Sequence, residues 1–173
     1  SKAILATSNP TKAISLAYDK MGQVVDGDSN IVWKRGRAAY KNNIRVKVGV
    51  ADSQSGNSAK CISAMLDLEG ENIQVESLLE TGRTPANILQ STLKEMTVLD
   101  LSGLSPEHVM YYISKGTPVY TMLGKNNPVL LVGYDNFNFS YFDPATETIK
   151  KVGQEDAKKL CAEGLNVFVA YLR

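Results

Sequence analysis

The chain contains two cysteines and a single histidine, the residue types from which a thiol–imidazole catalytic pair is built. Such a pair needs its imidazole within hydrogen-bond reach of the sulfur. Cys61 falls among aliphatic residues at helical spacing, where a thiol stays protonated and unreactive. Cys161 falls in a later predicted helix, and His108 follows a Ser-Pro-Glu sequence typical of a helix start. We therefore interpret all three as structural residues and keep an active Cys61 as the alternative.

A run of cations without any acid covers residues 34–47 and is accompanied by Trp33 and Tyr40. Basic and aromatic side chains in this mixture bind anionic polymers such as nucleic acid or teichoic acid. The candidate anion-binding patch consists of Lys34, Arg35, Arg37 and Lys41. The solvated face of a two-stranded ribbon explains the same residues, and a formal net charge of +1 gives no general attraction for nucleic acid. We therefore favour the ribbon and find no strong signal for nucleic-acid binding.

The composition is that of a folded domain without a metal or cofactor. The chain has 173 residues, of which 43% are hydrophobic, so it is long and apolar enough to build a core. The two cysteines lie far apart and match neither a zinc motif nor a disulfide framework, and no glycine-rich phosphate loop occurs. We predict no metal and no cofactor. Because the chain begins with Ser1 rather than Met, we expect a piece of a longer protein.

The hydrophobic pattern divides the chain into two parts. Residues 1–50 predict a helix over 10–22, followed by strands over 31–33 and 44–50 that would form the basic ribbon. We expect this first part to pack on the core of the second part, residues 51–173, which opens with a polar loop.

The second part begins with helices and ends with strands. The predicted helices cover residues 58–69, 73–81, 85–94, 106–115 and 154–163. The predicted strands cover residues 96–101, 118–122, 128–134, 139–142, 148–152 and 167–172. Asp135-Asn136 supplies turn residues between two of these strands. Segregated helices and strands predict an α+β fold, with a helical layer packed on an antiparallel sheet.

The second part also carries short motifs in a definite order. They are Gly70 after the first helix, Thr117-Pro118-Val119 before a strand, Gly133-Tyr134-Asp135 at the end of the next strand, and Asp143-Pro144 after the strand that follows. Their order and spacing resemble those of the papain-like cysteine peptidases that process double-glycine leader peptides, and of their broader relatives. The resemblance covers residues 51–173 and implies a papain-like fold for them.

In these peptidases a cysteine opens the first helix, a histidine opens a later strand, an aspartate orients the histidine and a glutamine completes the oxyanion hole. The resemblance places these positions at Asn57, Asn127, Asp143 and Gln54. A carboxamide neither forms a thiolate nor exchanges a proton near neutral pH. The resemblance thus implies that nucleophile and base are lost, with Asn57, Asn127 and Asp143 hydrogen-bonded at the former site. Turn chemistry explains Asn127 and Asp143 as well.

The leading functional hypothesis is a catalytically inactive papain-like domain that holds a peptide or protein segment in the former active-site cleft. Other domains of a larger bacterial protein are the further expected partners. One alternative is a cysteine amidase or peptidase that uses Cys61, and another is a module that binds anionic polymers through residues 31–50. The resemblance favours an extracytoplasmic or membrane-associated parent protein, although the apolar runs of this sequence are too short for a membrane span.

Overall fold

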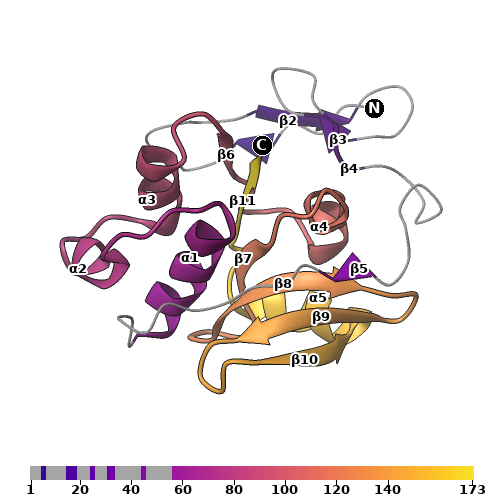
Figure 1. Ribbon diagram of the computed structural model, residues 1–173. Helices are drawn as coiled ribbons and strands as arrows, with labels where there is room; N and C mark the ends of the chain where they lie inside the picture. The colour runs from indigo at the N-terminus through magenta and orange to yellow at the C-terminus, as the bar shows by residue number, and fades with distance from the viewer. Residues whose placement is uncertain (1–4, 7–14, 19–23, 26–30, 34–43, 46–55) are drawn as a thin grey trace.

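The computed structural model describes residues 56–173 and five short strands that precede them. These strands are β1 (Leu5–Ala6), β2 (Ser15–Tyr18), β3 (Val24–Val25), β4 (Ile31–Trp33) and β5 (Ile44–Arg45). Strands β1 to β4 pair in chain order as one antiparallel sheet, whereas β5 pairs with β8 of a larger sheet (Figure 1). The N-terminal part therefore contributes a strand to the sheet of the second part.

Two predictions for residues 1–50 are wrong. The helix predicted over 10–22 fails at its centre, because Ser15–Tyr18 is strand β2, which pairs with β1 and β3. Backbone pairing on both sides outweighs the local helical pattern there. The predicted two-stranded ribbon also fails, because β4 pairs with β3 while β5 pairs with β8. The proposed anion-binding residues Lys34, Arg35, Arg37 and Lys41 lie outside the described residues, so their role stays a prediction.

Three helices form a layer on one side of the larger sheet, as predicted. They are α1 (Asn57–Leu68), α2 (Val75–Glu80) and α3 (Pro85–Thr92). The start of α3 follows from its sequence, since Thr84 Oγ1 accepts the Asn87 N–H at 3.1 Å and Pro85 occupies the first turn. Gly70 follows α1 with a φ of 81°, a conformation that glycine adopts without strain.

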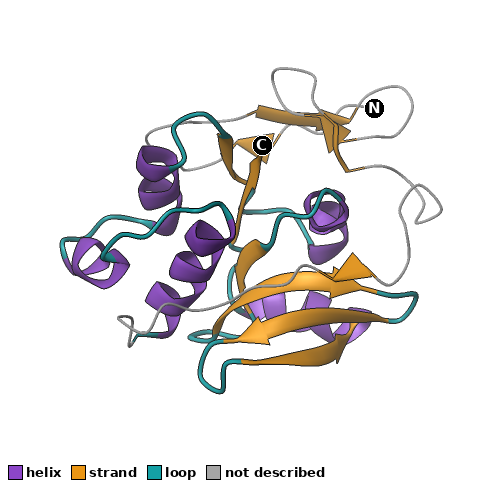
Figure 2. Ribbon diagram, in the orientation of Figure 1, coloured by secondary structure: helices purple, strands orange, loops and turns teal. Residues whose placement is uncertain are grey.

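The larger sheet is antiparallel and has the strand order β10-β9-β8-β7-β11-β6 (Figure 2). Its strands are β6 (Thr97–Asp100), β7 (Val119–Met122), β8 (Pro128–Tyr134), β9 (Asn138–Asp143), β10 (Thr148–Gly153) and β11 (Phe168–Leu172). Asp135 holds the predicted turn between β8 and β9, because its Oδ1 accepts the N–H groups of Phe137 and Asn138 at 2.9 and 2.7 Å.

Helices cover both faces of this sheet. On one face, α1 to α3 enclose a core that includes Leu130 and Val132 of β8. On the other face, Val129 and Leu131 of the same strand join a second core. That core is closed by η2 (Pro106–Val109), α4 (Met110–Ser114) and α5 (Gln154–Glu163). Because alternate residues of a strand face opposite sides, burial on both faces explains the unbroken apolar run of β8. The predicted packing of a helical layer on an antiparallel sheet is confirmed.

Candidate functional site

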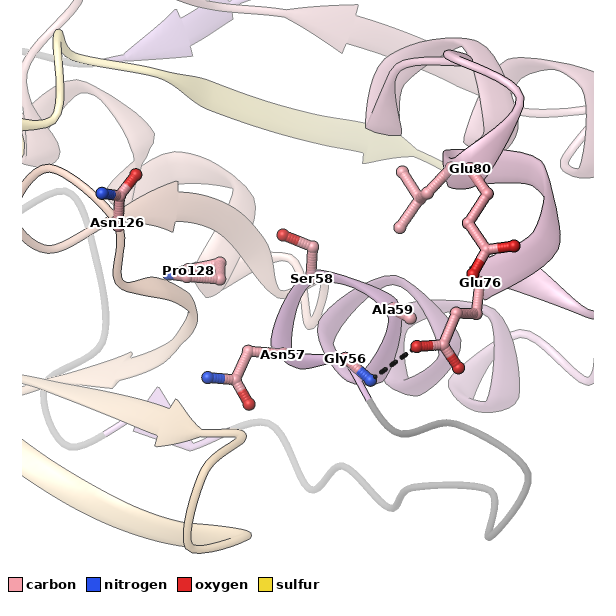
Figure 3. Close-up of a pocket in the computed structure, with 9 residues that line it drawn as sticks. Gly56, Asn57, Ser58, Ala59, Glu76, Glu80, Asn126 and Pro128 are labelled. Atoms are coloured by element: carbon pink, nitrogen blue, oxygen red, sulfur yellow. Dashed lines mark hydrogen bonds between the residues drawn. The ribbon is translucent and has the colours of Figure 1, made fainter.

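A pocket of about 410 Å³ opens at the N-terminus of α1, between α1, α2 and the loop that leads into β8 (Figure 3). Its volume lies within the range of about 300–1,000 Å³ that is usual for ligand pockets. The lining residues are Gly56, Asn57, Ser58, Ala59, Glu76, Leu79, Glu80, Asn126 and Pro128. The pocket thus combines two amides, a hydroxyl and two carboxylates with an apolar surface.

The first turn of α1 is capped by a residue of another helix. Gly56 precedes the helix in an extended conformation, and no side chain at the start of α1 forms a capping hydrogen bond. Instead, Glu76 Oε1 of α2 accepts the Gly56 N–H at 3.0 Å (Figure 3). A carboxylate at this position also interacts favourably with the positive end of the helix dipole. A Cβ at position 56 would lie 3.1 Å from Glu76 Oε1, so glycine allows this close approach.

Asn57 and Ser58 open the helix and point in different directions within the pocket (Figure 3). Asn57 is exposed, with its amide directed away from α2. The Ser58 hydroxyl lies 3.1 Å from the hydroxyl of Tyr120, a buried residue of β7. Burial raises the pKa of Tyr120, and the hydrogen bond between Tyr120 and Ser58 only partly offsets this effect. Tyr120 therefore stays protonated near neutral pH and is not a base for Ser58.

Asn127 belongs to the loop before β8, where its neighbours Asn126 and Pro128 line the pocket. Its own side chain turns back to that loop, because Asn127 Nδ2 donates to the Leu123 carbonyl at 3.3 Å. The Asn127 carbonyl also accepts the Leu123 N–H at 2.9 Å. Asn127 is therefore a turn residue that borders the pocket without lining it.

Asp143 ends β9, and its carboxylate accepts hydrogen bonds from the turn that follows and from β10. Oδ1 accepts the Ala145 N–H at 3.0 Å and Oδ2 accepts from Lys150 Nζ at 2.6 Å. The bond from Lys150, with that from Ala145, holds the pKa of Asp143 below its ordinary value. This turn lies against the first turns of α1, since Lys60 Nζ donates to the Pro144 carbonyl at 3.5 Å.

The structure brings Asn57 and Asp143 to the same side of the fold but does not join them by a hydrogen bond. Within residues 56–173, no hydrogen bond links Asn57, Asn127 and Asp143 to one another. The predicted polar cluster is therefore not formed by direct bonds among these three side chains. Gln54 lies outside the described residues, so its assignment stays a prediction.

Both cysteines are buried and carry raised pKa values. Cys61 is 0% exposed, and its pKa is raised mainly by burial and further by the negative charge of Asp143. Burial raises the pKa of Cys161 to about 11, although a contact with Thr121 lowers it slightly. Neither thiol lines the pocket. These features agree with the interpretation of both as structural residues.

His108 lies in η2, where it caps the start of that helix. Its Nδ1 accepts the Ser105 N–H at 3.1 Å, and the Ser105 hydroxyl lies 3.0 Å from the same nitrogen. The pKa of His108 is lowered, chiefly by burial. The chain's single imidazole is therefore used in a capping box, and it does not line the pocket.

Sequence reasoning missed four residues that shape the site: Ser58, Glu76, Glu80 and Tyr120. The spacing of Glu76 and Glu80 in a predicted helix places them on one face, which is a signal available in the sequence. The pairing of Ser58 with Tyr120 joins residues 62 positions apart and leaves no local pattern. Among the described residues, no group of three potential ligands is arranged to hold a metal ion.

Known structures share this fold. No protein-family model and no curated protein sequence matches the chain. The structure is similar to a Bacillus anthracis protein assigned as a C39-like peptidase, with a TM-score of 0.65 and 13% identity over 77% of this chain and 98% of that one. It is also similar to a double-glycine-motif protease of an AMS/PCAT transporter, solved with a leader peptide, with a TM-score of 0.53 and 16% identity over 76% and 97% of the two chains.

The described helices are all too short or too polar to cross a lipid bilayer.

The likeness covers 98% and 97% of the two similar chains, so it extends over a whole peptidase-type domain. With its helical layer and antiparallel sheet, the chain has the α+β papain-like fold of the C39-like peptidases.

Proposed function

We propose that this chain is a papain-like domain that binds a peptide segment in the pocket at the N-terminus of α1 without hydrolysing it. The observation that supports this function most is the composition of the pocket. Where the family resemblance places a nucleophilic cysteine, the pocket offers the amide of Asn57 and the hydroxyl of Ser58. Neither group reacts as a thiolate does, and no imidazole lines the pocket to activate Ser58.

The same pocket suits an extended peptide. The amides of Asn57 and Asn126 provide both donors and acceptors for a peptide backbone. Ala59, Leu79 and Pro128 supply an apolar surface against which side chains can pack. Binding of this kind needs neither a nucleophile nor a base, so it survives the loss of both. The similar transporter protease was solved with a leader peptide, which is a precedent for peptide binding in this fold.

A binding assay with a matched pair of variants tests the proposal. The protein is mixed with a pool of random-sequence decapeptides, separated by size exclusion, and the peptides that elute with it are identified by mass spectrometry. We expect retained peptides of unchanged length. Asn57→Phe fills the mouth of the pocket and is expected to abolish retention. Asp67→Phe, at an exposed position of the same helix outside the pocket, is the control and is expected to retain peptides.

The enzyme alternative has a different result in the same assay. Shortened peptides that disappear when Cys61→Ala replaces the wild type would show that Cys61 is a nucleophile and would overturn the proposal. Equal retention by the wild type and Asn57→Phe would place peptide binding elsewhere on the chain.

A further inference from the structure

We infer that Leu165 is a second contact point for the bound peptide and takes an apolar side chain several residues away from the segment in the pocket. This inference rests on the proposed function and adds a feature of the peptide that the domain selects. It derives from three properties of Leu165: its backbone conformation, its exposure, and its place beside the loop that borders the pocket.

Leu165 follows α5 in a backbone conformation that favours glycine. Its φ is 68°, in the left-handed region where the Cβ of an L-residue crowds the backbone. The Leu165 N–H donates to the Ala162 carbonyl at 3.0 Å. The next N–H, that of Asn166, donates to the Cys161 carbonyl at 2.8 Å. These two bonds form a Schellman ending, in which glycine is the usual residue at the position that Leu165 occupies.

The side chain of Leu165 gives the fold no packing in return for this strain. Leu165 is 82% exposed, the highest value among the large hydrophobic residues that the structure describes. It belongs to neither hydrophobic core. Strained backbone is concentrated at sites that bind ligands, and an exposed apolar side chain stabilises a protein only when a partner covers it. We therefore interpret Leu165 as a residue that contacts a ligand.

The residue before Leu165 touches the loop of residues 123–127, which joins β7 to β8. A Cβ at Gly164 would lie 2.6 Å from the Cβ of Met122 and 2.8 Å from the carbonyl oxygen of Gly124, so glycine allows this close approach. The Gly124 N–H also donates to the Leu160 carbonyl at 2.9 Å. The end of α5 is thus packed directly against this loop.

The other end of the same loop borders the pocket, where Asn126 and Pro128 line it (Figure 3). With about 3.8 Å between consecutive Cα atoms, the contact of Gly164 with Gly124 places the Cα of Leu165 within about 20 Å of that of Asn126. An extended decapeptide spans about 33 Å. A peptide of this length that is held in the pocket can therefore cross the loop and reach Leu165.

The decapeptide pool tests this inference with three variants. Leu165→Asn removes the apolar surface and introduces a residue that tolerates the left-handed conformation. Leu165→Met keeps an apolar side chain. Phe137→Ala is the control, because Phe137 is 78% exposed but lies in the turn after β8, at the opposite end of that strand from Pro128.

We expect Leu165→Asn to retain about 3- to 10-fold less peptide than the wild type, the range for partial burial of one leucine side chain. The peptides that it still retains should contain fewer aliphatic and aromatic residues. Leu165→Met and Phe137→Ala should match the wild type in both the amount and the composition of the retained peptides.

Urea unfolding adds a readout that a structural role would move in the opposite direction. Because the strain at residue 165 is relieved, Leu165→Asn should lower the equilibrium constant of unfolding about 2- to 5-fold. A single substitution would then weaken peptide binding and stabilise the fold.

The possible outcomes separate this inference from the proposed function. Unchanged retention and composition in Leu165→Asn would overturn the inference and leave peptide binding in the pocket intact. A less stable Leu165→Asn would show that the side chain supports the fold, and a peptide-free wild type that elutes as a dimer while this variant elutes as a monomer would assign Leu165 to a contact between copies. Either result would overturn the inference. Retention of no peptide by the wild type would contradict both the proposed function and the inference.

Discussion

The two ends of α1 are built in opposite ways. At its C-terminal end, Glu69 accepts the Tyr171 hydroxyl at 2.6 Å and the guanidinium of Arg173 at 2.8 and 2.7 Å. Arg173 also donates to the carbonyls of Lys115 and Gly116 at 3.3 and 3.1 Å. At the N-terminal end the same helix borders an open pocket. Among the described residues, the side chain that caps this end is Glu76 of α2, which accepts the Gly56 N–H.

This contrast assigns different roles to the two ends. The side chain of Glu69 is 5% exposed, so its bonds to Tyr171 and Arg173 join the helical layer to the C-terminal end of the chain in a protected environment, and Arg173 extends this link to the end of α4. The bond from the buried Tyr171 hydroxyl to this carboxylate is charge-assisted and therefore stronger than a bond between neutral groups, whereas the more exposed Arg173 contributes less. The exposed amide of Asn57 at the other end contributes little to stability and stays available to a ligand. We therefore expect stability to depend on the C-terminal end and binding on the N-terminal end.

The largest expected effect concerns Cys61, which lies one turn inside α1 from the pocket. At pH 8, a pKa of about 11 instead of 9.0 already lowers the thiolate fraction of Cys161 about 100-fold. The pKa of Cys61 is raised further. We predict that iodoacetamide modifies both thiols of the native protein at least about 100-fold more slowly than those of the urea-unfolded protein. Rapid modification of native Cys61 below pH 8 would contradict the closed packing beneath the pocket.

The next effect is on the free energy of unfolding. Glu69→Ala leaves the buried hydroxyl of Tyr171 without its acceptor, which costs about 1–3 kcal/mol. Arg173 is 44% exposed, so the lost ion pair adds little to this cost. Asn57→Ala should change the stability by less than about 0.5 kcal/mol. Urea unfolding of the two variants measures the difference, and equal losses would remove the contrast between the ends.

The dependence of the free energy of unfolding on pH below neutrality tests the same contrast. Burial alone would raise the pKa of Glu69, but the hydrogen bonds from Arg173 and Tyr171 bring it below its ordinary value of 4.5. A depressed pKa in the folded state stabilises the protein above pH 4.5, and this stabilisation is lost as the pH falls through the folded pKa. The stability difference between the wild type and Glu69→Gln should therefore be full at pH 7 and shrink below pH 4.5. A difference independent of pH would mean that the carboxylate charge has no role.

The smallest expected difference is that between two variants of buried tyrosines, one near each end of α1. Tyr171→Phe removes a hydrogen bond to a carboxylate, worth about 1.5–3 kcal/mol, whereas Tyr120→Phe removes one that is shared with the Ser58 hydroxyl, worth about 0.5–1.5 kcal/mol. The variants remove the same atom, so each is the control of the other. We predict the greater loss of stability for Tyr171→Phe in urea unfolding. The reverse order would indicate that the pocket end carries more of the stability.

Most of the fold of residues 56–173 follows from the sequence because its signals are local. Gly70 and Thr84-Pro85 mark helix ends, and Asp135 marks the turn between β8 and β9. The apolar run over residues 128–134 also predicts strand β8, and the structure shows that this strand is buried on both faces. In residues 15–18, by contrast, pairing with two other strands decides the structure, and a periodic pattern read within one segment cannot reveal such partners.

The candidate site was less predictable for the same reason. The resemblance placed Asn57 at the start of α1, and the structure puts it in the pocket. The sequence did not indicate that Asn127 turns back to Leu123, or that Glu76 would cap Gly56 across 20 positions. The bond of Glu69 to Arg173 spans 104 positions. Such pairs depend on how the layers meet and have no local signature.

Hydrogen–deuterium exchange of the full chain with and without the decapeptide pool tests the central claim most directly. The account predicts added protection at residues 56–60, 76–80 and 126–128, unchanged exchange at 68–70 and 171–173, and peptides recovered at their original length. Added protection confined to the C-terminal end of α1, no added protection at the pocket, or cleavage of the recovered peptides would contradict the account of an open, binding end that performs no hydrolysis.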